Sequence, residues 1–140
     1  MDLLQQIQFY NEGITKKLVG KYAQQIPVKF RDLNTNQKVV LEMVSIKAHT
    51  VKCFAELFSI TMSASQLISK MVKDRLVIRE ENPNNRREML IRLDLEGQEF
   101  IDTTHRIKYD LFNSQFSSLT EEELTTLLSL YKRIYDNMED

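Results

Sequence analysis

The sequence predicts a mainly α-helical chain that carries one small β-hairpin. Apolar residues recur at three- and four-residue steps through most of the 140 residues, which is the spacing of an amphipathic helix. Only three glycines and two prolines are present to interrupt helices. One segment beyond residue 76 instead alternates polar and apolar residues around Asn82-Pro83-Asn84-Asn85, as two strands joined by a turn do. A chain of this length can form one domain with a core of its own.

A long first helix is predicted over residues 2–26, and Pro27 ends it because proline lacks an amide donor. Its apolar stripe consists of Leu3, Ile7, Tyr10, Ile14, Leu18, Tyr22 and Ile26. A second helix starts near Thr35, with Asn34 or Thr35 as its N-cap. A short third helix follows Thr50, whose hydroxyl can accept a hydrogen bond from its first turn.

The fourth helix and the hairpin follow each other directly. After a tight link at Ser59-Ile60-Thr61, a helix is predicted over Met62–Arg75. The residues that this helix should bury are Ala64, Leu67, Ile68 and Met71. Two strands, Leu76–Glu81 and Arg86–Leu93, then form the hairpin. A helix, a tight turn and a second helix followed by a hairpin is the pattern of a winged helix-turn-helix, a DNA-binding domain.

Two further helices end the chain. Asp94 can cap a fifth helix over Leu95–Phe116, and Thr120 with Glu123 fits a capping box that opens a sixth. The stripe of the sixth helix consists of Leu124, Leu127, Leu128, Tyr131, Ile134, Tyr135 and Met138. One small domain cannot cover both this stripe and the stripe of the first helix. We therefore expect a helical dimerisation region and a homodimer.

Charge is distributed unevenly along the chain. Residues 1–60 and residues 61–92 each have a net charge of +3, residues 93–140 have −7, and the whole chain has −1. This asymmetry favours one face that meets a polyanion, although ordinary variation in surface charge explains it equally well.

Other classes of protein lack their sequence signatures here. Without a Gly-rich phosphate loop, a nucleophile elbow or clustered His, Cys and Asp residues, we expect no enzyme, no cofactor and no metal site. His49 and His105 have no neighbours at the spacing of a dedicated metal site. There is no apolar run of 18 residues, Cys53 is the one cysteine, and we expect no signal peptide. The expected compartment is the reducing cytoplasm.

Several motifs occur in order from Leu33 onward. They are Leu33-Asn34-Thr35-Asn36-Gln37, Thr50-Val51-Lys52-Cys53-Phe54-Ala55, Asn82-Pro83-Asn84-Asn85-Arg86-Arg87, Leu93-Asp94-Leu95-Glu96-Gly97 and Leu119-Thr120-Glu121-Glu122-Glu123-Leu124. In this order they resemble the MarR family of bacterial transcription regulators over residues 33–138. The resemblance implies a DNA-binding lobe at 34–94 and a dimerisation lobe at 1–30 and 95–140. It also implies a repressor that binds a pseudo-palindromic operator in double-stranded DNA as a homodimer, and a small-molecule effector.

The residues expected to contact DNA come from the fourth helix and the hairpin. They are Ser63, Ser65, Gln66, Ser69, Lys70, Lys73, Asn85, Arg86 and Arg87. Gln66 carries an amide that can pair with adenine, whereas lysines suit phosphate. The resemblance assigns Arg87 to the minor groove and Arg86 to the DNA backbone. The alternative is a solvated helix face and an ordinary turn.

The sequence departs from the family pattern in three places. Asn85 replaces an aspartate that braces the inserted arginine, Arg75 replaces a glycine, and one residue is missing, a gap we assign to the turn at Ser59–Ser63. The weaker brace and the negative net charge leave open a winged-helix module that binds another protein, with DNA binding reduced or lost. Cys53 is expected to be a structural thiol, because the redox cysteine of some family members lies near the end of the first helix.

Overall fold

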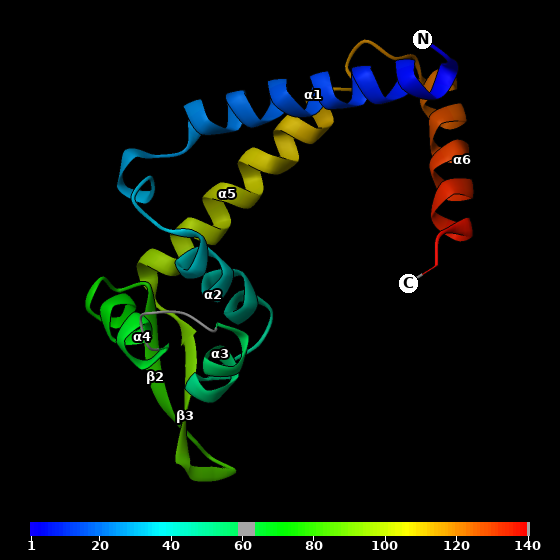
Figure 1. The fold of residues 1–140 in the computed structure, drawn as a ribbon. Coiled ribbons are helices and arrows are strands. Elements are labelled where there is room, and N and C mark those ends of the chain that lie inside the picture. Colours follow the sequence, from blue (N-terminus) through cyan, green and yellow to red (C-terminus); the bar gives the residue numbers. More distant parts are fainter. Residues whose placement is uncertain (59–63, 140) are drawn as a thin grey trace. The chain divides into compact units, whose positions relative to one another are not determined.

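A computed structural model of the chain describes residues 1–58 and 64–139 (Figure 1). Its elements in chain order are α1 (Leu3–Gln25), η1 (Val28–Phe30), α2 (Thr35–Ile46), β1 (His49–Thr50), α3 (Val51–Leu57), α4 (Ala64–Lys73), β2 (Val77–Asn82), β3 (Asn85–Leu93), α5 (Leu95–Ser114) and α6 (Glu121–Asn137). This order confirms the predicted fold class, mainly α with a small β wing. The chain divides into two compact units, one made of Met1–Gln25 with Ile107–Asp140 and the other of Ile26–Arg106. The functions expected of two lobes remain predictions, because compactness does not reveal what a lobe binds.

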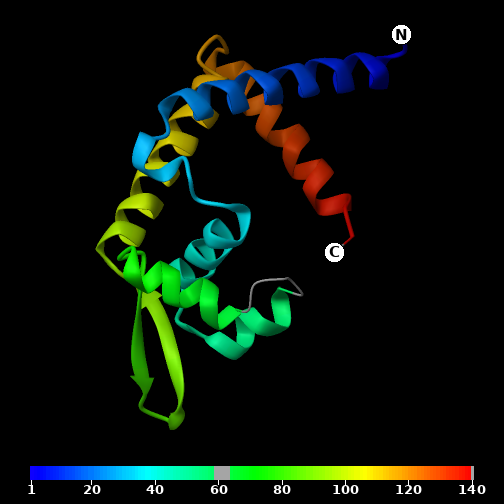
Figure 2. The ribbon, with the colours of Figure 1, turned by 60° about the vertical axis from the view of Figure 1, so that its left-hand side comes forward.

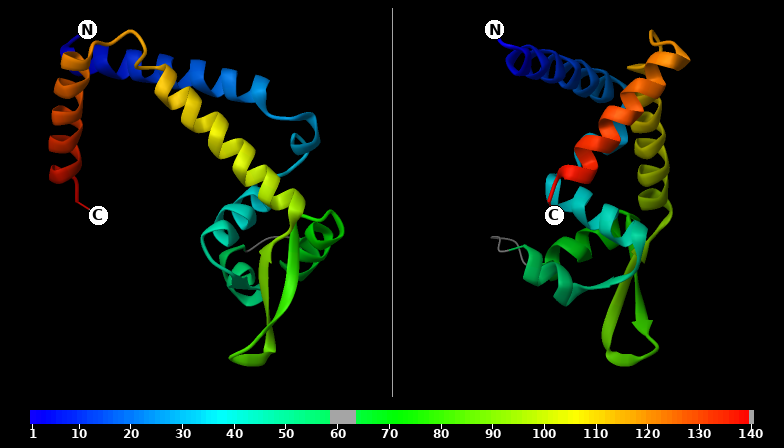
Figure 3. Two further views of the ribbon diagram at one scale, coloured as in Figure 1. Left: turned by 180° about the vertical axis from the view of Figure 1, so that it is seen from behind. Right: turned by 90° about the vertical axis from the view of Figure 1, so that its right-hand side faces the viewer.

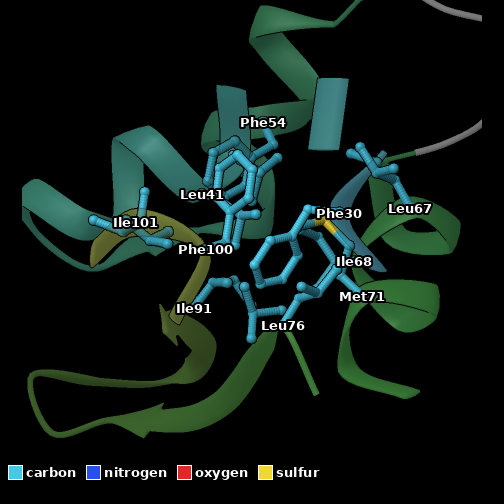
Figure 4. Packing of buried hydrophobic residues seen from close by; sticks show 14 residues of the cluster. Phe30, Leu41, Phe54, Leu67, Ile68, Met71, Leu76, Ile91, Phe100 and Ile101 are labelled. Carbon is cyan, nitrogen blue, oxygen red and sulfur yellow. The ribbon is translucent and has the colours of Figure 1, made fainter. Parts of the chain in front are cut away.

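The core of the 26–106 unit is built by residues from every helix of that unit and from the hairpin (Figure 4). The buried residues of this cluster are Phe30, Val40, Leu41, Val44, Phe54, Ala64, Leu67, Ile68, Met71, Leu76, Val77, Ile91, Phe100 and Ile101. All four residues predicted to be buried on the fourth helix belong to it. The periodicity therefore assigned the two faces of α4 correctly.

The sheet has three antiparallel strands in the order β1-β3-β2. Val77 and Ile91 are fully buried, and Arg79 is the partner of Ile91 across the strands. Because side chains alternate along a strand, the odd-numbered residues of β2 point to the core side of the hairpin, where α4 lies. Figures 2 and 3 show the hairpin projecting beyond the helices of its own unit. The sequence did not predict β1, whose two residues are too few to produce a period.

The end of α4 explains the arginine that stands where glycine is usual. Arg75 has a φ of 60°, the left-handed conformation that commonly ends helices. The amide of Leu76 donates to the carbonyl of Met71 (2.9 Å), and the amide of Arg75 donates to the carbonyl of Val72 (3.1 Å). These two bonds form a Schellman motif, which satisfies carbonyls left open at the helix end. The backbone thus adopts the turn that glycine would favour, with a side chain at the strained position.

The first turn of α5 is fastened to the same point. The amide of Asp94 donates to the carbonyl of Leu76 (3.0 Å), and the amide of Glu96 donates to the carbonyl of Arg75 (3.1 Å). A Cβ atom added to Gly97 would lie 2.0 Å from that Leu76 carbonyl oxygen. No side chain fits at position 97, because the backbone of Leu76 lies too close. This accounts for the glycine that ends the Leu93-Asp94-Leu95-Glu96-Gly97 motif.

Three of the predicted helix caps, at Asn34, Thr50 and Thr120, are present, whereas, among the described residues, the Asp94 side chain accepts only from the amide of the next one, Leu95. Asn34 caps α2 and forms a capping box with Gln37, and Thr50 accepts a hydrogen bond from the amide of Cys53 at the start of α3. Thr120 and Glu123 form the capping box of α6. Each box satisfies amides that lack partners within the helix.

Lys29 in η1 is bound to the start of α5. Its ammonium group contacts the carboxylates of Glu96 (3.3 Å) and Glu99 (2.5 Å). The hydrogen bond that Lys29 donates to the Glu99 carboxylate is the main reason that the pKa of Lys29 is raised above its ordinary value of 10.5. Because the group stays charged at neutral pH, this contact does not make stability depend on pH there.

The other unit contains α1, α6 and the second half of α5. Within the described residues, neither α1 nor α6 has a buried side chain. Large apolar side chains are exposed on both, among them Leu3, Ile7, Tyr10, Leu128, Tyr131, Ile134 and Tyr135. Among the residues that the structure describes, no helix is long and apolar enough to cross a membrane.

Candidate nucleic-acid interface

The outward face of α4 presents most of the predicted contact residues. Ser65, Gln66, Ser69, Lys70 and Lys73 are exposed on it. Their exposure follows from the burial of the opposite face, since residues three and four apart share one side of a helix. Ser63 lies outside the described residues.

A groove of about 580 Å³ separates α4 from the hairpin and the start of α3. Its lining residues are Thr50, Val51, Lys52, Ser65, Ser69, Arg79, Arg87, Glu88 and Met89. The structure thus brings together three predicted site residues, Ser65, Ser69 and Arg87. The groove has three cationic side chains, one carboxylate and three hydroxyls, a set that suits an anionic strand.

Lys52 and Arg79 were not among the predicted site residues. Arg79 could have been found, because it lies two residues after Val77 and so shares the core side of the strand. No sequence pattern indicated Lys52. The short α3 has too few turns for its periodicity to show which of its sides faces the hairpin.

Arg79 spans the groove from β2 to α4. Its Nη2 atom donates to Ser69 Oγ at 2.8 Å and lies 3.5 Å from the carbonyl oxygen of Ser65. A cation is thereby held beside Ser65 and Ser69 on the outward face of α4.

The tip of the hairpin is ordered by asparagine side chains. Asn82 Oδ1 accepts from the amide of Asn84 (3.0 Å), and Asn85 Oδ1 accepts from the backbone amide of Arg87 (3.1 Å). We expect Asn85 to brace the guanidinium of Arg87 more weakly than an aspartate would, and in the structure its side chain contacts the backbone of Arg87 instead. Asn85 therefore fixes where the chain leaves the turn, with Arg86 and Arg87 exposed beside it.

Not all the lysines of α4 are near the groove. Lys70 lines a separate polar pocket together with Asp32, Asp74 and Glu96. Lys73 is exposed on the last turn of α4 and is not a lining residue of the described groove. Lys70 shares its pocket with these three carboxylates and with Lys29, whereas Lys73 does not line it, so Lys73 is the better candidate of the two for a phosphate contact.

The cysteine and the histidines are not lining residues of the groove. Cys53 Sγ is half-buried and lies 3.5 Å from His49 Nδ1. His105 Nε2 contacts the Glu42 carboxylate at 3.0 Å, which joins α5 to α2. No group of three potential metal ligands occurs within residues 1–58 and 64–139.

Comparison with known proteins gives likeness at the level of structure. No protein-family model matches the chain, and no curated protein matches it. Bacillus subtilis YusO is 20% identical with a TM-score of 0.74, over 97% of this chain and 96% of YusO. The MarR-like transcriptional regulator Tm0816 of Thermotoga maritima is 22% identical with a TM-score of 0.66, over 97% of this chain and 96% of its own. Staphylococcus aureus MepR bound to ethidium bromide is 17% identical with a TM-score of 0.71, over 94% of this chain and 96% of its own.

These structures match nearly the whole chain, including the helices on both sides of the hairpin. At such identities the likeness concerns the fold. The chain therefore has the winged-helix fold of the MarR-like transcriptional regulators.

Proposed function

We propose that the protein is a transcription regulator that recognises a specific sequence in duplex DNA. In this proposal α4 enters the major groove and the hairpin reaches the adjacent minor groove. The observation that carries it is the groove between them, where Lys52, Arg79 and Arg87 surround the hydroxyls of α4.

The side chains divide into three kinds by chemistry. Gln66 offers an amide that can pair with both edge atoms of adenine, and Ser65 and Ser69 offer small hydroxyls. Lys52 and Lys73 are point charges, which suit phosphate oxygens. Arg87 extends from the hairpin tip, where the negative potential of a narrow minor groove attracts arginine.

The proposed assembly is a homodimer on a pseudo-palindromic operator. Its support is the exposed apolar side chains of α1 and α6, which a second copy would cover. Two copies would present two recognition helices about 34 Å apart, one turn of B-DNA.

We further propose that the protein represses transcription and that a small-molecule effector regulates its binding to DNA. MepR has been solved with ethidium bound, which is an aromatic cation. In this chain an apolar cavity of about 320 Å³ lies between α1 and the second half of α5. Its lining residues are Leu18, Val19, Tyr22, Lys108, Leu111 and Phe112. Such walls suit an apolar effector.

A second candidate function is a winged-helix module that binds another protein. It is favoured by Glu88, whose carboxylate lines the groove and would repel phosphate. The net charge of −1 also favours it over a strongly basic DNA-binding domain.

The experiment that tests the proposal is a fluorescence-anisotropy titration on duplex DNA. The fragment upstream of the protein's own gene would be compared with a shuffled fragment between about 50 and 200 mM salt. Specific binding whose affinity falls steeply with salt supports the regulator, because neutralised phosphates release counterions. Absence of binding to either fragment by the folded dimer contradicts it and favours the protein-binding module.

A further inference from the structure

Arg79 occupies a position from which it can couple the two DNA-facing elements. It lies on β2, one strand away from Arg87 on β3, and its guanidinium reaches α4. We propose that Arg79 is a positioning residue that fixes the recognition helix to the hairpin, so that α4 and Arg87 meet DNA as one surface. This inference rests on the proposed function and deepens it.

The register of the hairpin makes the contact. Arg79 lies opposite Ile91, which is fully buried, so both residues are on the side of the hairpin that packs against the helices. A straight-chain cation on this side cannot enter the apolar core. It extends along the core surface instead, to the polar edge of α4 at Ser65 and Ser69.

The two contacts fix both position and rotation of the helix. The bond from Nη2 to Ser69 Oγ is 2.8 Å long, and the second approach, to the Ser65 carbonyl oxygen, is 3.5 Å. These serines are four residues apart, so the guanidinium touches successive turns on one face. The other side of α4 is held by apolar packing, which is not directional. The charged hydrogen bond adds the direction that packing lacks.

The bond also determines what Ser69 can offer to DNA. Because the hydroxyl oxygen accepts from Arg79, its own hydrogen remains available to donate. We therefore expect Ser69 to meet an acceptor on the DNA, such as a phosphate oxygen or a purine N7.

The test uses Arg79→Lys, Ser69→Ala and the double variant. Lysine keeps the positive charge but lacks the planar fork of the guanidinium, so it separates charge from positioning. Arg92→Lys is the matched control. Arg92 lies on β3 opposite Ile78 and pairs with Glu80, on the other side of the same hairpin. Circular dichroism and a thermal melt establish that each variant folds.

The readouts are the preference for operator over shuffled DNA and the salt slope. Arg79→Lys should lower the preference about tenfold, the size expected when one charge-assisted hydrogen bond is lost. Its salt slope should stay the same, since no phosphate contact is removed. The preference of the double variant for the operator should be no lower than that of Ser69→Ala alone. Arg92→Lys should bind like wild type.

Three results would overturn the inference. The first two are an unchanged preference in Arg79→Lys and a further independent loss in the double variant. The third comes from an additional variant, Arg79→Ala, which removes the charge: a uniform loss for all DNA with a salt slope lower by about one unit. The last result would make Arg79 a direct phosphate contact.

A measurement without DNA separates this inference from the proposed function. The unfolding midpoints of the two single variants and the double variant give the coupling between Arg79 and Ser69 directly. A wild-type protein that does not bind duplex DNA overturns both the proposed function and the positioning role, even if the coupling is present. DNA binding without coupling overturns the positioning role alone.

Discussion

Two residues at the base of the hairpin, Arg75 and Gly97, show how a backbone junction constrains side-chain identity. Arg75 sits at a φ of 60°, and Gly97 lies against the backbone of Leu76. The first position tolerates a side chain at an energetic cost, whereas the second leaves no room for one. The pattern of the MarR family, which the sequence resembles, has glycine at both positions, but the physical requirement at the two positions differs.

Gly97→Ala should destabilise the protein by about 3 kcal/mol, the upper end of the range for overpacking. The added Cβ would lie 2.0 Å from the Leu76 carbonyl oxygen, which is backbone and cannot rotate away. Chemical denaturation measures the change. Gly20→Ala is the control: it has nothing within 4 Å of the added atom and should gain about 0.5–1 kcal/mol from helix propensity. Equal stability of Gly97→Ala and wild type would mean that α5 starts farther from Leu76.

Arg75→Gly should stabilise the protein by about 1 kcal/mol, because glycine adopts the left-handed conformation without the Cβ clash. Asp74→Gly, one residue earlier, should instead lose stability through greater freedom of the unfolded chain. Thermal denaturation of the two variants gives opposite shifts. A loss of stability in both would show that the Arg75 side chain makes a contact worth more than the strain.

At the scale of elements, the sequence predicted α4 well because its period is strong and its buried face is uninterrupted. The four buried residues were all identified, and so were the exposed ones on the opposite face. The groove was predicted only in part. Periodicity shows which residues share a face of one element, but not which face of another element lies opposite. Arg79 and Lys52 join the site through the packing of β2 and α3 beside α4, which involves residues distant in sequence.

The recognition face of α4 predicts two distinct mutant phenotypes. Gln66→Ala should lower the preference for the operator with little change in salt slope, because it removes contacts to a base. Lys73→Ala should weaken binding to all sequences about equally and lower the slope by about one unit. Titrations on operator and shuffled DNA at several salt concentrations separate the two. If Ser65→Ala abolishes specificity while Gln66→Ala has no effect, a different residue reads the base.

The hairpin predicts a difference between adjacent arginines. Arg87→Ala should weaken operator binding by about 1–3 kcal/mol, since it removes the arginine that lines the groove between the hairpin and α4. Arg86→Ala is the comparison and should produce a smaller, sequence-independent loss. Asn85→Asp should bind as well as wild type or better, because a carboxylate can still accept from the Arg87 amide and adds charge beside the guanidinium. If a folded Arg87→Ala variant binds the operator with wild-type affinity, the hairpin is an ordinary turn and Arg87 does not contact DNA.

At the scale of the whole molecule, the exposed apolar surface predicts a dimer. Sedimentation at micromolar concentration should give about twice the chain mass of 16.5 kDa. Ile134→Glu, on the exposed face of α6, should dissociate the dimer and weaken DNA binding, because it places a charge in the expected interface. Ile46→Glu, at an exposed position in the 26–106 unit, should leave the mass unchanged. A folded wild-type monomer would contradict the dimer.

The hydrogen bond between Asp94 and Leu76 closes the hairpin at its base, so the tip is free to change in length. For a flexible loop, each doubling of length costs only about 0.6 kcal/mol in closure entropy. Each residue added to both strands extends the arm by roughly 3.3 Å. In the proposed complex with DNA, insertions beside Pro83 would therefore lengthen the reach of the hairpin while α4 and α5 keep their places. The length of the hairpin tip can consequently change without altering the contact that Arg79 makes with α4 nearer the base of the hairpin.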